Sequence, residues 1–146
     1  MKRNLLMGCA ALTVFFVNMA HADFVLRSSD PAVCDYISGH WSGTGKASNW
    51  FIGDCFYHGK GTIGTVDQAG HFTVHLESDK DSGSIFCPRH TKKKFTGTCV
   101  NGAVTFMTEY GNLTGDFTRN TGDVNGTLSI GRGLSATVAI QFGREG

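Results

Sequence analysis

The chain has 146 residues, with 13 lysines and arginines against 12 aspartates and glutamates, so its formal net charge is only +1. This balance offers no global attraction to nucleic acid or to an anionic membrane, and we expect no nucleic-acid partner. The length fits one domain after removal of any leader, and the 20 glycines favour strands and turns over long helices.

The first 22 residues are typical of a secretory signal peptide. A basic start at residues 1–3 precedes an apolar run over residues 5–17 and the small-x-small exit Ala20-His21-Ala22. The apolar run is shorter than the roughly 20 residues of a membrane-spanning helix, so we expect cleavage after Ala22 and no membrane span. The mature chain, residues 23–146, would form a single domain in a secreted or periplasmic location, with a formal net charge of −1 once Lys2 and Arg3 are removed.

Cysteine usage agrees with an oxidising compartment. Cys9 would leave with the signal, and an even number would remain: Cys34, Cys55, Cys87 and Cys99. Four cysteines form two disulfides in one of three pairings, which the sequence alone does not decide. We favour Cys34–Cys55 with Cys87–Cys99, because each pair closes a local loop. No two of them have C-x-x-C spacing, so a zinc site is not expected.

Secondary structure can be followed along the mature chain from its turns and alternations. Residues 29–36 predict a short helical turn, with a Ser or Asp cap before Pro31. Residues 71–77 and 134–142 alternate apolar and polar side chains, which is typical of half-buried antiparallel strands. Asn101-Gly102 predicts a two-residue hairpin turn, and residues 67–70 and 119–122 predict slightly longer connections.

Short connections between alternating segments predict that strands adjacent in sequence are adjacent in space. We therefore expect an all-β fold, an antiparallel up-and-down meander of about eight strands that closes into a small barrel. A two-sheet sandwich is the alternative. In four segments, residues 37–41, 95–99, 113–117 and 124–128, a glycine stands midway between two apolar residues. Because alternate strand residues share a face, these glycines would point inward, where they let a strand coil and leave room opposite.

The segment Ile37-Ser38-Gly39-His40-Trp41 resembles the first strand of lipocalin-type and avidin-type barrels, in which Gly-x-Trp closes the barrel floor. Residues 95–99 are similar to the Thr-Gly strand motif of avidins, and Thr108-Glu109-Tyr110 stands where lipocalins have Thr-Asp-Tyr. The resemblance implies a calycin-type barrel with an internal ligand. It also implies that a late arginine, Arg132 or Arg144, packs over Trp41. Gly43 replaces the asparagine with which avidins hold biotin, so the resemblance does not extend to that ligand.

Three aromatic residues are the candidates for ligand contact: Trp41, Trp50 and Phe51. Trp41 would also plug the barrel floor. Trp50 and Phe51 follow Ser48-Asn49 and precede a glycine, which suits a pocket rim, although aromatic residues in this setting are more often ordinary core.

The histidines do not predict a metal site. His71 and His75 share a strand face but would lie about 13 Å apart, too far to hold one ion. His75 and Glu77 could form an acid–base pair on the face opposite the apolar residues, or they could simply be solvated. No serine or cysteine has the setting of a nucleophile, so we name no catalytic residues and expect no cofactor, and an enzyme is the third hypothesis after the two binding roles given below.

The strongest local charge is the basic run Arg89, His90, Lys92, Lys93 and Lys94, which lies between Cys87 and Cys99. If those cysteines were paired, the run would form a stapled loop able to bind an anionic surface or a protein partner. The other interpretation is a solvated hairpin whose lysines protect a sheet edge.

Two hypotheses follow. The first is a binding protein that holds a small, largely apolar ligand inside the barrel near Trp41, Trp50 and Phe51. The second is an interaction protein with a filled core that binds its partner through residues 89–94. A barrel of eight strands can be either filled or just wide enough for one small ligand, and that difference separates the two.

Overall fold

A computed structural model of the protein describes residues 22–108, 111–131 and 133–145. The signal peptide therefore lies outside the described residues, apart from Ala22. The Glu109-Tyr110 part of the lipocalin-like loop and Arg132 also lie outside them.

The described part of the chain forms nine strands and one 3₁₀ turn, η1, at Val33–Asp35. The strands are β1 (Ala22–Arg27), β2 (Gly39–Asn49), β3 (Gly53–Ile63), β4 (His71–Gly83), β5 (His90–Val100), β6 (Ala103–Thr108), β7 (Gly111–Phe117), β8 (Thr121–Gly131) and β9 (Leu134–Arg144).

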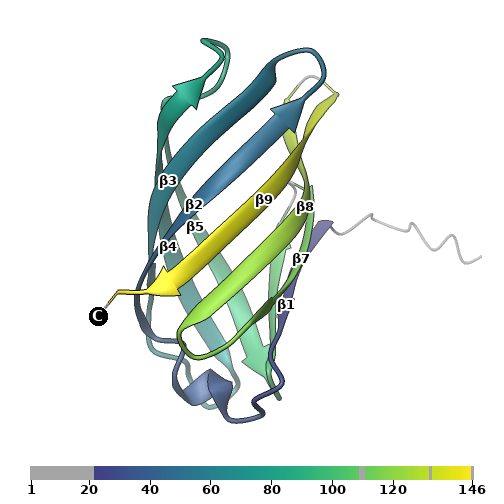
Figure 1. Ribbon diagram of the computed structural model, residues 1–146. Coiled ribbons are helices and arrows are strands. Elements are labelled where there is room, and N and C mark those ends of the chain that lie inside the picture. The colour runs from purple at the N-terminus through teal and green to yellow at the C-terminus, as the bar shows by residue number, and fades with distance from the viewer. Residues whose placement is uncertain (1–21, 109–110, 132, 146) are drawn as a thin grey trace, which may run out of the picture.

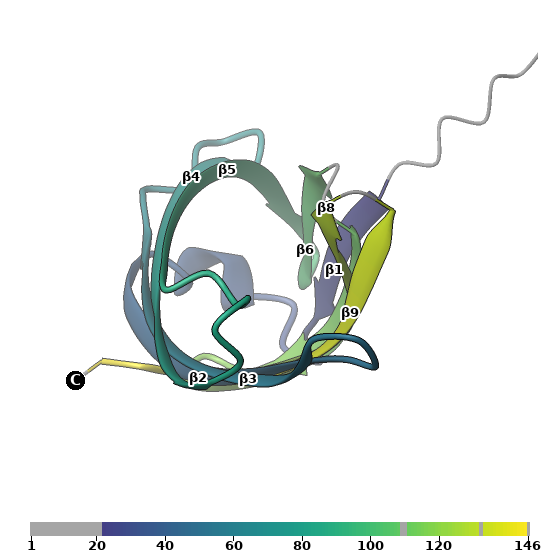
Figure 2. The ribbon, with the colours of Figure 1, turned by 90° about the horizontal axis from the view of Figure 1, so that it is seen from above.

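The strands close into one barrel in the order β1-β6-β5-β4-β3-β2-β9-β8-β7, and β7 returns to β1 (Figures 1 and 2). The expected all-β barrel is confirmed, but it has nine described strands and is not purely antiparallel. The sequence prediction missed β1, which inserts between β6 and β7. It pairs antiparallel with β6, where Phe24 faces Phe106, and parallel with β7, where Phe24 faces Leu113. This short strand supplies the parallel pair that a meander lacks.

Several local predictions are confirmed. The expected strand at residues 71–77 is the first half of β4, and that at residues 134–142 lies within β9. Asn101 and Gly102 join β5 to β6 with φ of 50° and 81°, the left-handed region that this turn requires. The expected helical turn exists as the single turn η1.

Gly97 shows what the inward glycines do. It lies on the inner face between Phe95 and buried Cys99, and its ladder partner on β6 is Phe106. A Cβ atom added to Gly97 would lie 2.7 Å from Cδ1 of the Phe106 ring. The ring of Phe106 therefore lies over the glycine, in the space that the sequence pattern predicted.

The core occupies one end and one side of the barrel. Val33 in η1 and Ile37 just after it are 0% and 2% exposed and pack with inner-face residues of four strands: Phe72, Val74, Cys99, Val104 and Phe117. A second cluster, Leu113, Val124 and Val138, lines β7, β8 and β9. We call the end capped by η1 the closed end and the opposite end, at the top of Figure 1, the open end.

The disulfide pairing that the sequence analysis favoured is wrong. The disulfides are Cys34–Cys99 and Cys55–Cys87. Cys34 and Cys99 lie at the closed end, whereas Cys55 and Cys87 lie at the open end. The members of each pair that we had favoured are separated by the length of a strand: β2 lies between Cys34 and Cys55, and nearly all of β5 lies between Cys87 and Cys99. Eleven residues of strand span about 36 Å, so those cysteines lie at opposite ends of the barrel.

Candidate functional site

The closed end is sealed by Trp41 and Arg144. Trp41 is 6% exposed, its indole Nε1 donates to the carbonyl oxygen of Ile37 at 2.9 Å, and its ring meets that of Phe142 edge-on at 5.7 Å. The Arg144 guanidinium carbon lies 4.4 Å from the centre of the Trp41 ring. The late arginine expected over Trp41 is therefore Arg144. A small ligand would have to enter the barrel from the other end.

Solvent reaches the interior on the β3–β4 side of the barrel. On β4, Phe72, Val74 and Leu76 share the inner face; the first two are 3% and 4% exposed, but Leu76 is 42% exposed. The side chain of Leu76 lies over its ladder partner on β3, Gly61, because a Cβ added to Gly61 would lie 2.9 Å from Leu76 Cδ2. An inward leucine with this exposure indicates accessible space above the buried core.

The inner face becomes polar beyond Leu76. Ser78 and Lys80 continue the alternation of β4 and are half-buried, and the ladder partner of Lys80 on β3 is Tyr57. Tyr57 is also half-buried, and this burial raises the pKa of its phenol above the usual value of 10.0. Tyr57 and Lys80 thus form a polar pair of neighbours on the wall, next to the apolar surface of Leu76.

Glycines make the adjoining wall thin. Gly45 on β2 is the ladder partner of Tyr57, and Gly59 and Gly61 follow Tyr57 along the inner face of β3. None of these positions carries a side chain that could fill the space beside Tyr57 and Leu76. The candidate site is therefore a region of the inner wall with Leu76 as its apolar part and Tyr57 and Lys80 as its polar part.

An aromatic cluster lies below this region. The rings of Phe24 and Phe95 are 6.0 Å apart, those of Phe95 and Phe106 are 6.2 Å apart, and those of Phe106 and Phe72 are 5.5 Å apart. Phe95 is the ladder partner of Val74, which is the inward residue before Leu76 on β4, towards the closed end. The cluster separates the candidate site from the closed end.

Trp50 and Phe51 are not near Trp41. They form the turn between β2 and β3 at the open end, whereas Trp41 is near the beginning of β2 at the closed end. Trp50 is 90% exposed and Phe51 69% exposed, so neither belongs to the core. Of the three aromatic residues proposed as ligand contacts, only Phe51 and Trp50 lie at the end through which a ligand could enter.

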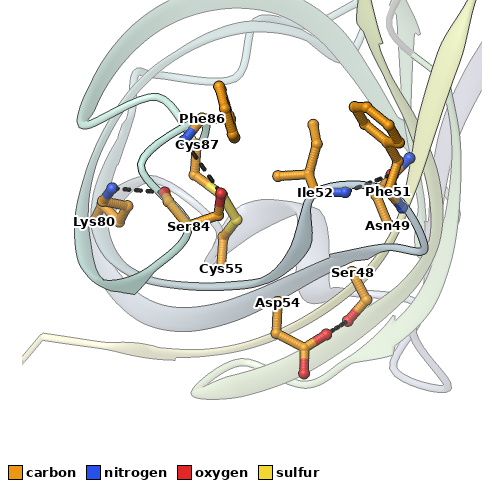
Figure 3. Close-up of a disulfide and its surroundings, with 10 residues drawn as sticks. All are labelled: Ser48, Asn49, Phe51, Ile52, Asp54, Cys55, Lys80, Ser84, Phe86 and Cys87. Atoms are coloured by element: carbon orange, nitrogen blue, oxygen red, sulfur yellow. Dashed lines mark hydrogen bonds between the residues drawn. A yellow bond between two sulfur atoms is a disulfide. The ribbon is translucent and has the colours of Figure 1, made fainter.

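The loop between β4 and β5 lies across the same end (Figure 2). Its Cys87 is bonded to Cys55 at the start of β3, and its Ile85 and Phe86 are 85% and 73% exposed. In Figure 3, Phe86, Ile52 and Phe51 point to one side of the β2–β3 wall, and Asp54 and Ser48 point to the other. The open end is thus lined by apolar side chains from two loops.

The basic run does not form a stapled loop. Only Arg89 lies in the β4–β5 loop, because His90, Lys92, Lys93 and Lys94 belong to β5, and Cys87 is not paired with Cys99. Register places His90, Lys92 and Lys94 on the outer face and Lys93 on the inner face opposite Leu76. On the outer face, His90 Nδ1 lies 2.6 Å from Asp79 Oδ1 and Lys92 Nζ lies 3.9 Å from Glu77 Oε1. Acidic side chains of β4 therefore offset part of the basic charge.

His58 and His90 contact carboxylates on the outer face. His58 Nδ1 is 2.5 Å from Asp81 Oδ1, and Glu77 contacts His90 across the ladder at 3.4 Å. His75 is exposed, and its ladder partner on β5 is Lys94. Across the described residues, no three histidine, cysteine, aspartate or glutamate side chains are grouped so that they could hold a metal ion.

Two hollows are open to the surface. One, of about 430 Å³, is a groove lined by outer-face residues such as Thr44, Phe56 and Gln141, and its lining also includes Gly45 and Tyr57 from the wall of the candidate site. The other, of about 450 Å³, lies at the closed end beside Cys34, Val66 and Cys99. Neither contains Trp41, Trp50 or Phe51.

Five residues of this region were not predicted from the sequence as site residues: Tyr57, Leu76, Lys80, Ile85 and Phe86. Continuing the alternation of residues 72, 74 and 76 would have placed Ser78 and Lys80 inside. The exposure of Ile85 and Phe86 had no such signal.

Comparison of the chain with protein-family models, with curated proteins and with solved structures finds no significant match to any of them. The likeness to lipocalins and avidins therefore remains a resemblance of short segments. Over the described ranges, none of the helical structure has the length and apolar character needed to cross a membrane.

Proposed function

We propose that this is a secreted or periplasmic binding protein that holds a small, largely apolar ligand inside the barrel. The ligand would enter at the open end, place its apolar part against Leu76, and direct a polar or acidic group towards Tyr57 and Lys80. The two disulfides suit an oxidising compartment, in agreement with the expected signal peptide.

The observation that carries this proposal is the 42% exposure of Leu76 on the inner face of β4, where Phe72 and Val74 are buried. A filled barrel would bury that leucine as it buries Val74. An accessible apolar surface with a few polar groups beside it is the usual composition of a small-molecule site.

The acidic side chains that contact His90 and Lys92 weaken the alternative, a partner bound through the basic run. Exposed ion pairs reduce the attraction that a basic strand offers to a distant anion, and salt screens the remainder. The exposure of Leu76 favours an internal ligand, and residues 89–94 offer no observation of similar weight for a partner bound through the basic run.

Two measurements test the proposal. Native mass spectrometry of the mature protein, purified after export, should show a small adduct that is absent after denaturation. In addition, dansyl-undecanoic acid, an apolar chain with one carboxylate, should bind with saturable fluorescence enhancement. Leu76→Trp should weaken that binding about tenfold or more, because the larger side chain occupies the accessible space.

His75→Trp is the matched control, because it adds the same indole one residue away on the outer face. It should leave probe binding unchanged. Probe binding that is absent, or that is equally weak in both tryptophan variants, would contradict an internal site.

A further inference from the structure

The most exposed large apolar side chains gather at one end of the molecule. Across the described residues, the four highest exposures among large apolar side chains are those of Trp50, Ile85, Phe86 and Phe51, at 90, 85, 73 and 69%. All four belong to the β2–β3 turn or the β4–β5 loop, which we call the apolar tips. Exposure of a large apolar side chain forgoes the free energy of burying it, so four such side chains on two short segments need a reason.

The β2–β3 turn holds its two aromatic residues in a fixed position. Asn49 is only 9% exposed, and its Oδ1 accepts hydrogen bonds from the backbone N–H groups of Phe51 and Ile52 at 2.7 and 3.0 Å. Its Nδ2 donates to the carbonyl oxygen of Ser135, near the start of β9, at 2.7 Å. One buried amide therefore ties the turn to the barrel, and Trp50 and Phe51 stand on an ordered support.

The β4–β5 loop is held equally firmly. The Ser84 carbonyl oxygen accepts from Lys80 Nζ at 2.9 Å and from the Cys87 N–H at 3.1 Å, and Ser84 Oγ accepts from the Phe86 N–H at 3.2 Å. The Cys55–Cys87 disulfide then joins this loop to the first residues of β3, directly after the other tip (Figure 3). The two apolar tips are thus one covalently linked unit.

The tips carry almost no net charge. Residues 49–54 contain one charged side chain, Asp54, which lies 3.5 Å from Lys46, and residues 83–89 contain one, Arg89. A surface with so little charge does not attract a charged partner over a long distance. Its partner must instead accept exposed aromatic and aliphatic side chains.

We propose that the apolar tips insert into the interfacial layer of a lipid bilayer with zwitterionic headgroups, which would place the open end of the barrel against the lipid. A protein interface of standard size needs about 800 Å² and some 20–30 residues on each side, far more than two short tips provide. Insertion of a few large side chains to a depth of roughly 5–10 Å needs no such area. Trp50 also suits this layer, because its ring is apolar and its N–H remains able to bond water or headgroups.

This inference is independent of an internal ligand. The test is flotation of the mature, disulfide-bonded protein with vesicles of pure phosphatidylcholine, read together with tryptophan emission. Trp41 is buried and Trp50 is exposed, so a blue shift on addition of vesicles reports on Trp50. Vesicle binding should change little between low and high salt, because no charge cluster drives it.

Trp50→Ser and the double variant Ile85→Ser/Phe86→Ser should each lower the vesicle partition coefficient about tenfold or more, since each removes apolar area worth over 1.4 kcal/mol. Val100→Ser is the matched control, because Val100 is a 53% exposed apolar residue in the hairpin at the closed end. It should bind vesicles like the unmodified protein.

Three results would overturn the proposal. One is a failure of the unmodified protein to bind phosphatidylcholine vesicles, and another is a loss of binding in Val100→Ser equal to that in the tip variants. The third is concentration-dependent dimerisation in analytical ultracentrifugation that the tip substitutions abolish, which would make the tips an interface between copies of this chain. Far-UV circular dichroism of each variant checks that the barrel is retained.

Discussion

Trp41 and Arg144 face each other across the β2–β9 ladder, and the guanidinium carbon of Arg144 lies over the indole at the closed end of the barrel, 4.4 Å from the ring centre. The same guanidinium donates from Nε to the carbonyl oxygen of Arg119 and from Nη1 to that of Ser38, each at 3.0 Å, and from Nη2 to that of Tyr36. One side chain therefore joins the end of β9 to the β7–β8 turn and to the segment that leads from η1 into β2.

Replacement of Arg144 tests how much these contacts at the closed end contribute to the free energy of unfolding. Arg144→Ala removes a cation–π contact worth about 0.5–2 kcal/mol and several hydrogen bonds worth about 1 kcal/mol each, part of which water replaces. We expect the free energy of unfolding to fall by about 2–3 kcal/mol in chemical denaturation monitored by Trp41 fluorescence. Arg144→Lys should recover only part of this, because an ammonium cannot reach three carbonyls from one plane.

Arg89→Ala is the control for the loss of a positive charge, because Arg89 is exposed in the β4–β5 loop. It should change stability by less than about 0.5 kcal/mol. If Arg89→Ala and Arg144→Ala lowered the free energy of unfolding equally, the Trp41–Arg144 contact would not be what stabilises the closed end.

Gly97 provides a test of the repeated glycine pattern. In Gly97→Ala the new methyl group would lie 2.7 Å from Cδ1 of Phe106 and 2.9 Å from the carbonyl oxygen of Thr105, so the ring must move. Overpacking of this kind costs about 1–3 kcal/mol, which should appear as a lower melting temperature.

Gly64→Ala should be tolerated, because the nearest atom to its new methyl group would be the Thr73 carbonyl oxygen at 3.5 Å, an ordinary contact. In a protein that carries Phe106→Leu, Gly97→Ala should lower the melting temperature less than it does when residue 106 is phenylalanine. If Gly97→Ala and Gly64→Ala were equally harmless, the glycine at residue 97 would not be there to accommodate the ring.

Local patterns in the sequence predicted local structure well. Alternation placed Phe72 and Val74 inside, Asn101-Gly102 made the expected turn, and Gly-x-Trp placed Trp41 at a closed end with a late arginine over it. The inward positions and the turn depend on neighbouring residues or on one strand, and strand geometry is enough to predict them. The closed end at Trp41 and its arginine were instead implied by the resemblance to lipocalins.

Contacts between distant segments were predicted poorly. The position of β1 between β6 and β7 has no signature in the segment Ala22–Arg27 itself, because any short apolar strand could pair there. The candidate site was missed for a related reason, since the accessibility of Leu76 depends on how the whole barrel is filled. The disulfides could have been predicted better, because antiparallel strands alternate in direction and bring every second turn to the same end.

The disulfides can be mapped and removed separately. Peptide mapping without reduction should recover Cys34 with Cys99 and Cys55 with Cys87. Removing the first bridge by Cys34→Ala/Cys99→Ala should lower stability by about 4 kcal/mol on chain-entropy grounds, since it closes a span of 65 residues.

Cys55→Ala/Cys87→Ala should act more locally. It should lower stability by about 3–4 kcal/mol for its span of 32 residues, and it should also speed tryptic cleavage after Arg89, because the β4–β5 loop loses its attachment to β3. Recovery of Cys34–Cys55 or Cys87–Cys99 peptides from the folded protein would contradict the fold as well as the pairing. Faster cleavage after Arg89 in the Cys34/Cys99 variant alone would contradict the assignment of the loop.

The ionisation of Tyr57 gives a test of the inner wall that needs no ligand. Burial disfavours the phenolate, so the pKa of Tyr57 is raised in the folded protein above the value near 10.0 that it has when unfolded. The sign follows from linkage: the stabilisation is fully present below pH 10 and is lost as the pH rises through the folded-state pKa. In an absorbance titration at 295 nm, the folded protein should therefore contain a phenol that ionises at higher pH than free tyrosine, and Tyr57→Phe should remove that step.

The same titration tests whether a ligand reaches Tyr57. A bound apolar ligand would shield the phenol further, so in the presence of dansyl-undecanoic acid the ionisation should shift to still higher pH. A phenol that titrates at its ordinary pKa with and without the probe would place Tyr57 in open solvent and away from the ligand.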